Sequence, residues 1–153
     1  MVNLERLSGS MIRQRGSIPK IVILDNGIIS AMSGLDFKSA KKDTIHWGRC
    51  VENVVGARLY YLAEQVGGQV FYWRERQHEM DYALKVGKET IGIEVKTNAE
   101  KVPASFSEFE RRFKPQKVMT ICYRQGSREI DRSRWIGLEE FLMDPYVVLK
   151  RGE

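Results

Sequence analysis

The chain has 153 residues, 42% of them hydrophobic, which is enough for one domain with its own core. No segment approaches the roughly 18 to 20 apolar residues of a membrane span, and no secretory signal pattern is present, so we expect a cytoplasmic protein without membrane contact. The net charge of +5 weakly favours a polyanionic partner. Cys50 and Cys122 stand outside any zinc-ligand pattern, which argues against a zinc site.

The first elements are predicted in chain order. Residues 1–17 have no clear periodicity and are expected to be a β-arm, a linker or the remnant of a preceding domain. Residues 20–24 form a short β-branched run that ends at an Asp-Asn-Gly turn signal, and a brief helix is expected at 28–32. A long helix is predicted from position 44 to about 65, because a capping residue precedes it, apolar residues recur at helical spacing, and two glycines close it.

The second half of the chain predicts a sheet. Three strands are followed by a Phe-rich helix that opens at Ser105, where Glu108 would complete a capping box, and then by a further strand. The hairpin strands must be antiparallel, and the crossover through the Phe-rich helix favours a parallel pairing. The fold class is therefore α/β with an αβββαβ order and a mixed central sheet flanked by helices. The predicted strands are 70–74, 80–86, 90–97, 117–123 and 135–137, and a last helix is predicted at 138–143.

The informative stretch is the hairpin that turns at Gly87-Lys88. Glycine at the first central position is typical of a two-residue type II′ turn, which pairs Val86 with Glu89. Continuing this register places Asp81 directly opposite Glu94. Strict alternation places both carboxylates on one face with Lys96, at the end of a shallow, open patch of small residues.

Two carboxylates this close repel each other unless a cation lies between them. Oxygen ligands suit Mg²⁺ or Mn²⁺, and the main-chain carbonyl of Val95 is placed to be a further ligand. Such an ion would polarise a phosphate and activate a water molecule, while Lys96 would orient that water or stabilise developing charge. Glu52 lies beside the apolar stripe of the long helix, either at the rim of the core or turned into a cleft. The alternative is a charged, half-exposed hairpin without a site.

Basic residues recur in short groups along the chain. Arg74 and Arg76 are predicted to share a strand face and to flank the acidic cluster. Lys41 and Lys42 belong to another group. Together these residues are candidates for contacts with nucleic-acid phosphates, and the alternative is a set of solvated surfaces.

The Asp81 and Glu94-Val95-Lys96 pattern resembles the motif of the PD-(D/E)XK nuclease superfamily, and the predicted αβββαβ order is similar to the core of that superfamily. Glu52 on the preceding helix matches an extra acidic residue that helps to hold the metal in several of its branches. The resemblance implies that Asp81, Glu94, Lys96 and Glu52 are catalytic, and that Asp81, Glu94, Val95 and Glu52 bind the metal.

A second resemblance covers most of the chain. The segments at 48–53, 70–74, 79–82 and 93–96 resemble the nuclease-like C-terminal domain of a prokaryotic AAA-type ATPase family, and 19–27 resembles the start of that domain. No G-x-x-x-x-G-K-[ST] phosphate-binding loop occurs, so the ATPase module is expected to be missing from this chain.

We therefore expect 1–17 to be a linker or domain remnant, 18–146 a PD-(D/E)XK nuclease-like domain and 147–153 a tail. The predicted function is a metal-dependent nuclease-like domain that hydrolyses or docks onto DNA, with Mg²⁺-dependent deoxyribonuclease activity as the enzymatic candidate and an ATPase module as a further partner. The alternative is a non-catalytic regulatory module of the ATPase that binds nucleic acid or protein.

Overall fold

A mixed β-sheet organises the chain in the computed structural model, which describes residues 1–9, 16–98, 101–124, 126, 128–130 and 133–150. Among these residues, eight strands hydrogen-bond in the order β2-β1-β3-β4-β5-β6-β8-β7. The strands are β1 (Val2–Arg6), β2 (Lys20–Val22), β3 (Gln69–Glu75), β4 (His78–Val86), β5 (Glu89–Lys96), β6 (Lys117–Cys122), β7 (Arg128–Ile130) and β8 (Ser133–Gly137). The helices are α2 (Asn26–Ser33), α3 (Phe37–Lys42), α4 (Thr44–Val66), α5 (Ser105–Phe113) and α6 (Leu138–Met143), and a 3-10 turn, η1, covers Pro145–Val148.

The predicted αβββαβ order is confirmed from α4 to β6. Strands β3, β4 and β5 pair antiparallel, whereas β5 pairs parallel with β6 through the crossover that contains α5. Strand β1 pairs parallel with β3 and antiparallel with β2, which brings the start of the chain into the sheet. Of the alternatives for 1–17, a β-strand is therefore observed at Val2–Arg6, while residues 10–15 lie outside the described residues.

Helix α4 has a capping residue at each end and an apolar side that packs on the sheet. The Asp43 side chain accepts hydrogen bonds from the main-chain N–H groups of Ile45 and His46, and Gly67 ends the helix with a left-handed φ of 65°. One side of the helix packs on the sheet. No helix among the described residues is both long and apolar enough to cross a membrane. The buried residues of α4 are Val51, Val55, Gly56, Ala57, Leu59, Leu62 and Ala63.

Two apolar clusters lie on opposite faces of the sheet. The larger one joins α4, α6 and η1 to Tyr82, Leu84 and their neighbours, and Val147 and Val148 of the predicted tail belong to it. The smaller one lies under α5. Gly92 is packed so closely under this helix that an added Cβ would lie 2.8 Å from the Phe109 ring. The expectation of a shallow, open patch here was wrong, because α5 covers it.

Two further expectations are corrected by the structure. Ala104 precedes α5 without a side-chain cap, and Glu108 pairs with Arg111 rather than completing a capping box. Arg76 lies in the two-residue turn between β3 and β4 with a positive φ of 54°, so it does not share a strand face with Arg74. Residues 151–153 of the predicted tail lie outside the described residues.

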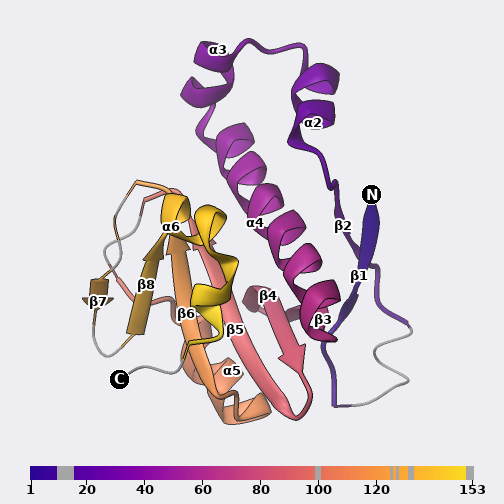
Figure 1. The fold of residues 1–153 in the computed structure, drawn as a ribbon, viewed down its shortest axis with the longest axis vertical. Coiled ribbons are helices and arrows are strands. Elements are labelled where there is room, and N and C mark those ends of the chain that lie inside the picture. Colours follow the sequence, from indigo (N-terminus) through magenta and orange to yellow (C-terminus); the bar gives the residue numbers. More distant parts are fainter. Residues whose placement is uncertain (10–15, 99–100, 125, 127, 131–132, 151–153) are drawn as a thin grey trace.

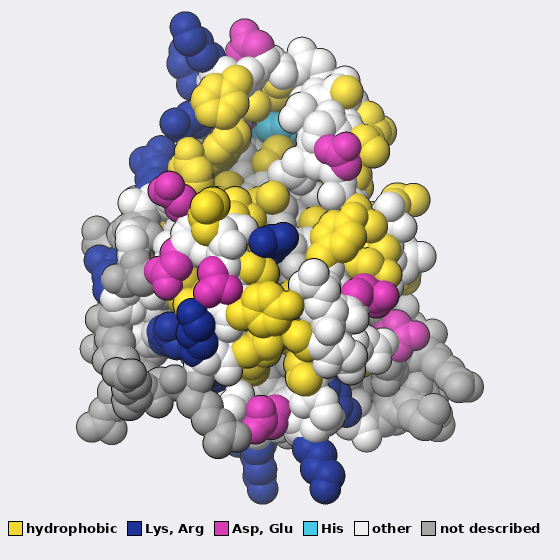
Figure 2. Space-filling model, in the orientation of Figure 1, with side chains coloured by type: hydrophobic (Ala, Val, Ile, Leu, Met, Phe, Trp, Pro, Cys, Tyr) yellow, Lys and Arg dark blue, Asp and Glu magenta, His cyan; other side chains and the backbone are white. Residues whose placement is uncertain are grey.

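Helices α2 and α3 form an arm at the N-terminal end of α4, at the top of Figure 1. Neither helix contains a buried residue. Figure 2 shows hydrophobic side chains gathered over this arm, with Lys and Arg side chains beside them. Exposed large hydrophobic residues here are Ile28, Met32, Leu35, Phe37 and Ile45.

Candidate functional site

The hairpin that carries the predicted site has the expected register. Val86 pairs with Glu89, and the ladder continues to Tyr82 and Ile93, with positive φ at Gly87 as a type II′ turn requires. The ladder ends there, so the predicted direct pairing of Asp81 with Glu94 is not formed. Asp81 and Glu94 lie directly beyond the last pair of the ladder.

A β-bulge in β4 is the reason for this ending. Phe71 of β3 pairs with Ala83, and Trp73 pairs with Met80, so two residues of β4 oppose one residue of β3. The extra residue breaks the strict alternation of faces, because Met80 and Ala83 both pack in the cluster under α5. Asp81 lies at this break, which turns its carboxylate toward the main chain of β5.

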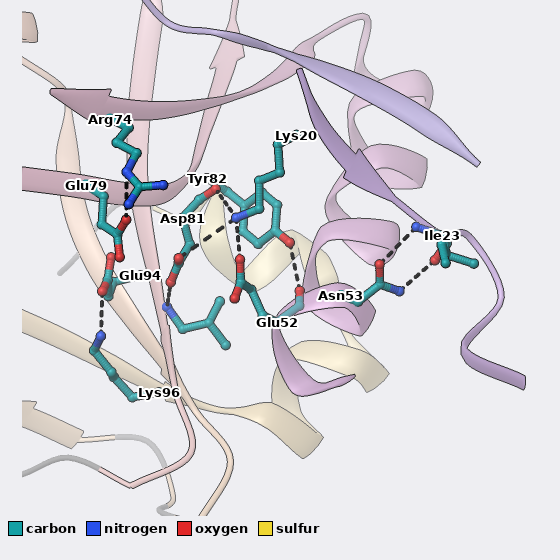
Figure 3. Close-up of polar contacts among 11 residues, drawn as sticks. Lys20, Ile23, Glu52, Asn53, Arg74, Glu79, Asp81, Tyr82, Glu94 and Lys96 are labelled. Atoms are coloured by element: carbon teal, nitrogen blue, oxygen red, sulfur yellow. Dashed lines mark hydrogen bonds and ion pairs between the residues drawn. The ribbon is translucent and has the colours of Figure 1, made fainter. Parts of the chain in front are cut away.

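Asp81 is held by three contacts from two residues, Val95 and Lys20. Its Oδ2 accepts a hydrogen bond of 2.8 Å from the main-chain N–H of Val95. Lys20 Nζ donates to its main-chain oxygen at 3.0 Å and lies 3.9 Å from Oδ1 (Figure 3). The carboxylate therefore bridges β5 and β2, and only 14% of the Asp81 side chain is exposed.

Glu52 approaches Asp81 from α4, as predicted for a helix packed on this part of the sheet. Its carboxylate forms a short ion pair with Lys20 Nζ, and its main-chain oxygen accepts a hydrogen bond of 2.8 Å from the Tyr82 hydroxyl (Figure 3). The Lys20 ammonium group also lies 4.2 Å from the centre of the Tyr82 ring. Glu52 and Asp81 thus share one lysine, and Gly56 leaves the space that the Tyr82 ring occupies beside α4.

Lys20 reaches this position because the loop after β2 is tied to α4. The Asn53 side chain accepts a hydrogen bond from the N–H of Ile23 and donates to its carbonyl, and it also donates to the side chain of Asn26. These bonds satisfy main-chain groups that β2 leaves unpaired, and they fix the strand against the helix. Lys20 was missed as a site residue, although it stands in the segment at 19–27 on which the second resemblance rests.

Glu94 and Lys96 form a separate pair on β5. Lys96 Nζ donates to Glu94 Oε1 at 2.6 Å, and the Glu94 side chain is 5% exposed. Glu94 Oε2 is buried and has no hydrogen-bond partner among the described residues. A buried carboxylate oxygen without a hydrogen-bond partner is costly, although the main-chain N–H of Asp81 also lies close enough to lower the pKa of the Glu94 carboxyl.

The carboxylates affect one another electrostatically. Burial, followed by the charges of Glu94 and Glu52, raises the pKa of Asp81 to about 7, against the opposing effects of Lys20 and the Val95 N–H. Burial also raises the pKa of Glu94, although Lys96 opposes this. Burial lowers the pKa of Lys96, but the charge and hydrogen bond of Glu94 outweigh it and the net shift is upward. Burial and the neighbouring carboxylates therefore both favour the protonated form of Asp81.

The donor set fits a small divalent ion in part. Asp81, Glu94 and the main-chain oxygen of Val95 are the hard oxygen donors that Mg²⁺ or Mn²⁺ prefers, and Glu94 offers an unpartnered oxygen. Among the described residues, however, no three acidic, His or Cys side chains lie close enough together to hold an ion by themselves. Lys20 lies between Glu52 and Asp81, so an ion held by both carboxylates would have to displace its ammonium group.

The predicted basic residues do not converge here. Arg74 lies beside the site and pairs with Glu79 at 3.6 Å, but Arg76 is exposed in the neighbouring turn. Lys41 and Lys42 are exposed on α3, in the arm beyond the sheet (Figure 1). The structure thus brings Glu52, Asp81, Glu94 and Lys96 to one region and leaves three of the four basic residues outside it.

The chain has the fold of a mixed α/β domain in which an acidic site lies at the open end of a central hairpin. A family profile described as "Domain of unknown function (DUF4143)" matches residues 47–141, more than half of the chain. The chain therefore belongs to this family. The matched segment runs from the first turn of α4 into α6 and contains Glu52, Asp81, Glu94 and Lys96 but not Lys20. No curated protein and no solved structure matches the chain.

Proposed function

We propose that this domain is a PD-(D/E)XK nuclease-like domain that acts on DNA and uses Mg²⁺ or Mn²⁺ to hydrolyse phosphodiester bonds. The proposal is carried by the convergence of Glu52, Asp81, Glu94 and Lys96 from α4, β4 and β5, with a buried Glu94 oxygen that lacks a partner. The resemblance of Asp81 and Glu94-Val95-Lys96 to the nuclease motif supports the same conclusion. We further propose that the domain works with an AAA-type ATPase module.

The chain's own groups would divide the work. Asp81 and Glu94, with the Val95 carbonyl, would hold the ion, and Glu52 would join them once Lys20 moves aside. When bound, the ion would polarise the phosphate and acidify a water molecule. The Lys96 ammonium group, fixed by Glu94 at 2.6 Å, would donate to a non-bridging phosphate oxygen or orient the attacking water.

A second candidate function is a non-catalytic nucleic-acid- or protein-binding module of the ATPase. It is favoured by one observation: Lys20 pairs with Glu52 and Asp81, and Lys96 pairs with Glu94. Charges that are satisfied in this way can hold a fold together without catalysis. The two functions differ in whether a divalent ion binds at this site and in whether DNA is cut.

The test is a nuclease assay on the purified chain with Mg²⁺ and with Mn²⁺, using linear, circular and single-stranded DNA. Wild type is expected to cleave, and Glu94→Ala and Lys96→Ala are expected to be inactive while circular dichroism shows a retained fold. Glu89→Ala is the matched control, since it removes an exposed carboxylate from the turn end of the same hairpin. If wild type binds DNA but does not cut it with either metal, the proposed nuclease function is refuted and the binding-module function is supported.

A further inference from the structure

A cavity of about 510 Å³ adjoins Asp81 on the side of β1 and β2. Its charged lining consists of three basic residues, Arg6, Lys20 and Arg74, and two acidic ones, Glu79 and Asp81. Arg6 comes from β1, Lys20 from β2 and Arg74 from β3, so segments that are far apart in sequence meet around this cavity. The cavity is open to solvent beside the acidic site.

The basic residues differ in how well they are paired. Lys20 is shared by Glu52 and Asp81, and Arg74 pairs with Glu79 on the surface. Arg6 is only 24% exposed, and its one ion pair among the described residues is a long contact of 4.0 Å to Glu75 Oε2.

That same oxygen of Glu75 is already paired at 2.5 Å with Arg112 from α5. The Nε of Arg6 is buried and has no hydrogen-bond partner among the described residues. A mostly buried guanidinium group with one weak contact lacks the anion that would offset its desolvation. Arg6 is therefore only weakly paired where it lines the cavity.

An anion that enters this cavity would meet the planar fork of N–H donors of Arg6. A phosphate group satisfies this geometry with two parallel hydrogen bonds. The cavity adjoins Asp81, so a phosphate held by Arg6 would place the next phosphodiester of the same strand toward the acidic site. An exposed Arg74 at the rim, with 72% of its side chain accessible, can turn from Glu79 to a neighbouring phosphate.

We propose that this cavity is a backbone-phosphate subsite for a nucleic-acid strand, with Arg6 as its principal ligand and Arg74 as its outer ligand. The proposal rests on the proposed function in taking DNA as the polyanion, but it does not require cleavage. It names the direction from which the strand reaches Asp81: along β1 and β3, and not over the arm formed by α2 and α3.

The experiment measures the binding of a short fluorescein-labelled single-stranded oligodeoxynucleotide to the full chain by fluorescence anisotropy. EDTA is present, so that neither metal nor cleavage contributes. Arg6→Gln is expected to weaken binding about 10-fold or more, as loss of a hydrogen-bonded charge contact implies. The slope of log affinity against log salt is expected to fall by about one. The affinity of Arg6→Lys is expected to lie between those of wild type and Arg6→Gln, because lysine keeps the positive charge but loses the planar fork of N–H donors.

Lys88→Gln is the matched control, because it removes one exposed positive charge at the opposite end of β4. Arg74→Gln is a second variant that leaves the core untouched, since Arg74 is exposed. Binding that is unchanged in both arginine variants would overturn the proposal. Equal weakening by Lys88→Gln, which would indicate non-specific attraction, would also overturn it. So would a wild type that does not bind the oligonucleotide even at low salt, in which case the anion would belong to a protein partner.

Failure of the proposed function gives a different pattern. If Arg6-dependent binding is seen but wild type never cleaves with Mg²⁺ or Mn²⁺, the phosphate subsite stands and the nuclease is refuted. If wild type cleaves and Arg6→Gln neither weakens binding nor changes the salt slope, the nuclease stands and the subsite is refuted.

Discussion

Replacing Asp81 with Asn should remove part of the pH dependence of stability. The Asp81 carboxyl titrates near its ordinary value of about 3.8 in the unfolded chain and at about 7 in the fold. The folded state therefore binds the proton more tightly, and stability is lost as the pH rises from about 4 through about 7. A shift of about three units corresponds to at most about 4 kcal/mol, at 1.36 kcal/mol per unit.

The Asn side chain removes this cost and keeps an oxygen that accepts the Val95 N–H. At about pH 8, Asp81→Asn should therefore be more stable than wild type by up to about 4 kcal/mol, and at about pH 4 the two should be similar. Urea unfolding followed by circular dichroism at several pH values measures this difference. The control is Glu79→Gln, which changes an exposed ion pair and should alter stability little at any pH.

The reasoning would be refuted if the free-energy difference between Asp81→Asn and wild type were the same at both pH values. That result would mean that Lys20 and the Val95 N–H at least balance burial and the two neighbouring carboxylates. Asp81 would then be an ordinary ion-pair partner, and the electrostatic reason for a divalent ion at this site would be lost.

Two other predictions follow from specific contacts. Lys20→Met should lower the free energy of unfolding of the metal-free protein by about 1 to 3 kcal/mol, because Glu52 and Asp81 lose their shared counter-ion. Mn²⁺ should then raise the melting temperature more in this variant than in wild type; equal shifts would contradict competition between Lys20 and the ion. Gly92→Ala should lower the free energy of unfolding by about 1 to 3 kcal/mol, because the new Cβ would lie 2.8 Å from the Phe109 ring. Gly48→Ala, where no atom lies within 4 Å of the new Cβ, should not lower it. Urea unfolding compares the two variants.

Local signals in the sequence were sufficient for the elements that position the site. Asp43 begins α4 and Gly67 ends it, and Gly87-Lys88 sets both the turn and the register of the β4–β5 hairpin. These features depend on residues that are neighbours in sequence, so periodicity and turn chemistry identify them. The predicted order of elements was confirmed for the same reason.

The geometry of the site depended on contacts that no local pattern contains. The bulge at Asp81 and Tyr82 is set by the pairing of β4 with β3, and it ends the ladder one pair short of Glu94. The hairpin considered alone has no bulge, and strict alternation therefore did not predict the break at Asp81. Packing of α5 over Gly92 then buried the patch that alternation predicted to be open.

The sequence by itself determined the α/β class, the hairpin register and the acidic residues that carry the resemblance. Only the tertiary structure brought Lys20 to Asp81, across 61 positions of the chain, and Arg6 to the cavity beside it. The physical reason is that β1 and β2 join the sheet through main-chain hydrogen bonds, and these bonds do not depend on the identity of the side chains. Which side chains then meet depends on the register of those strands and on the Asn53 contacts to the loop after β2, and neither is encoded in the residues near Asp81.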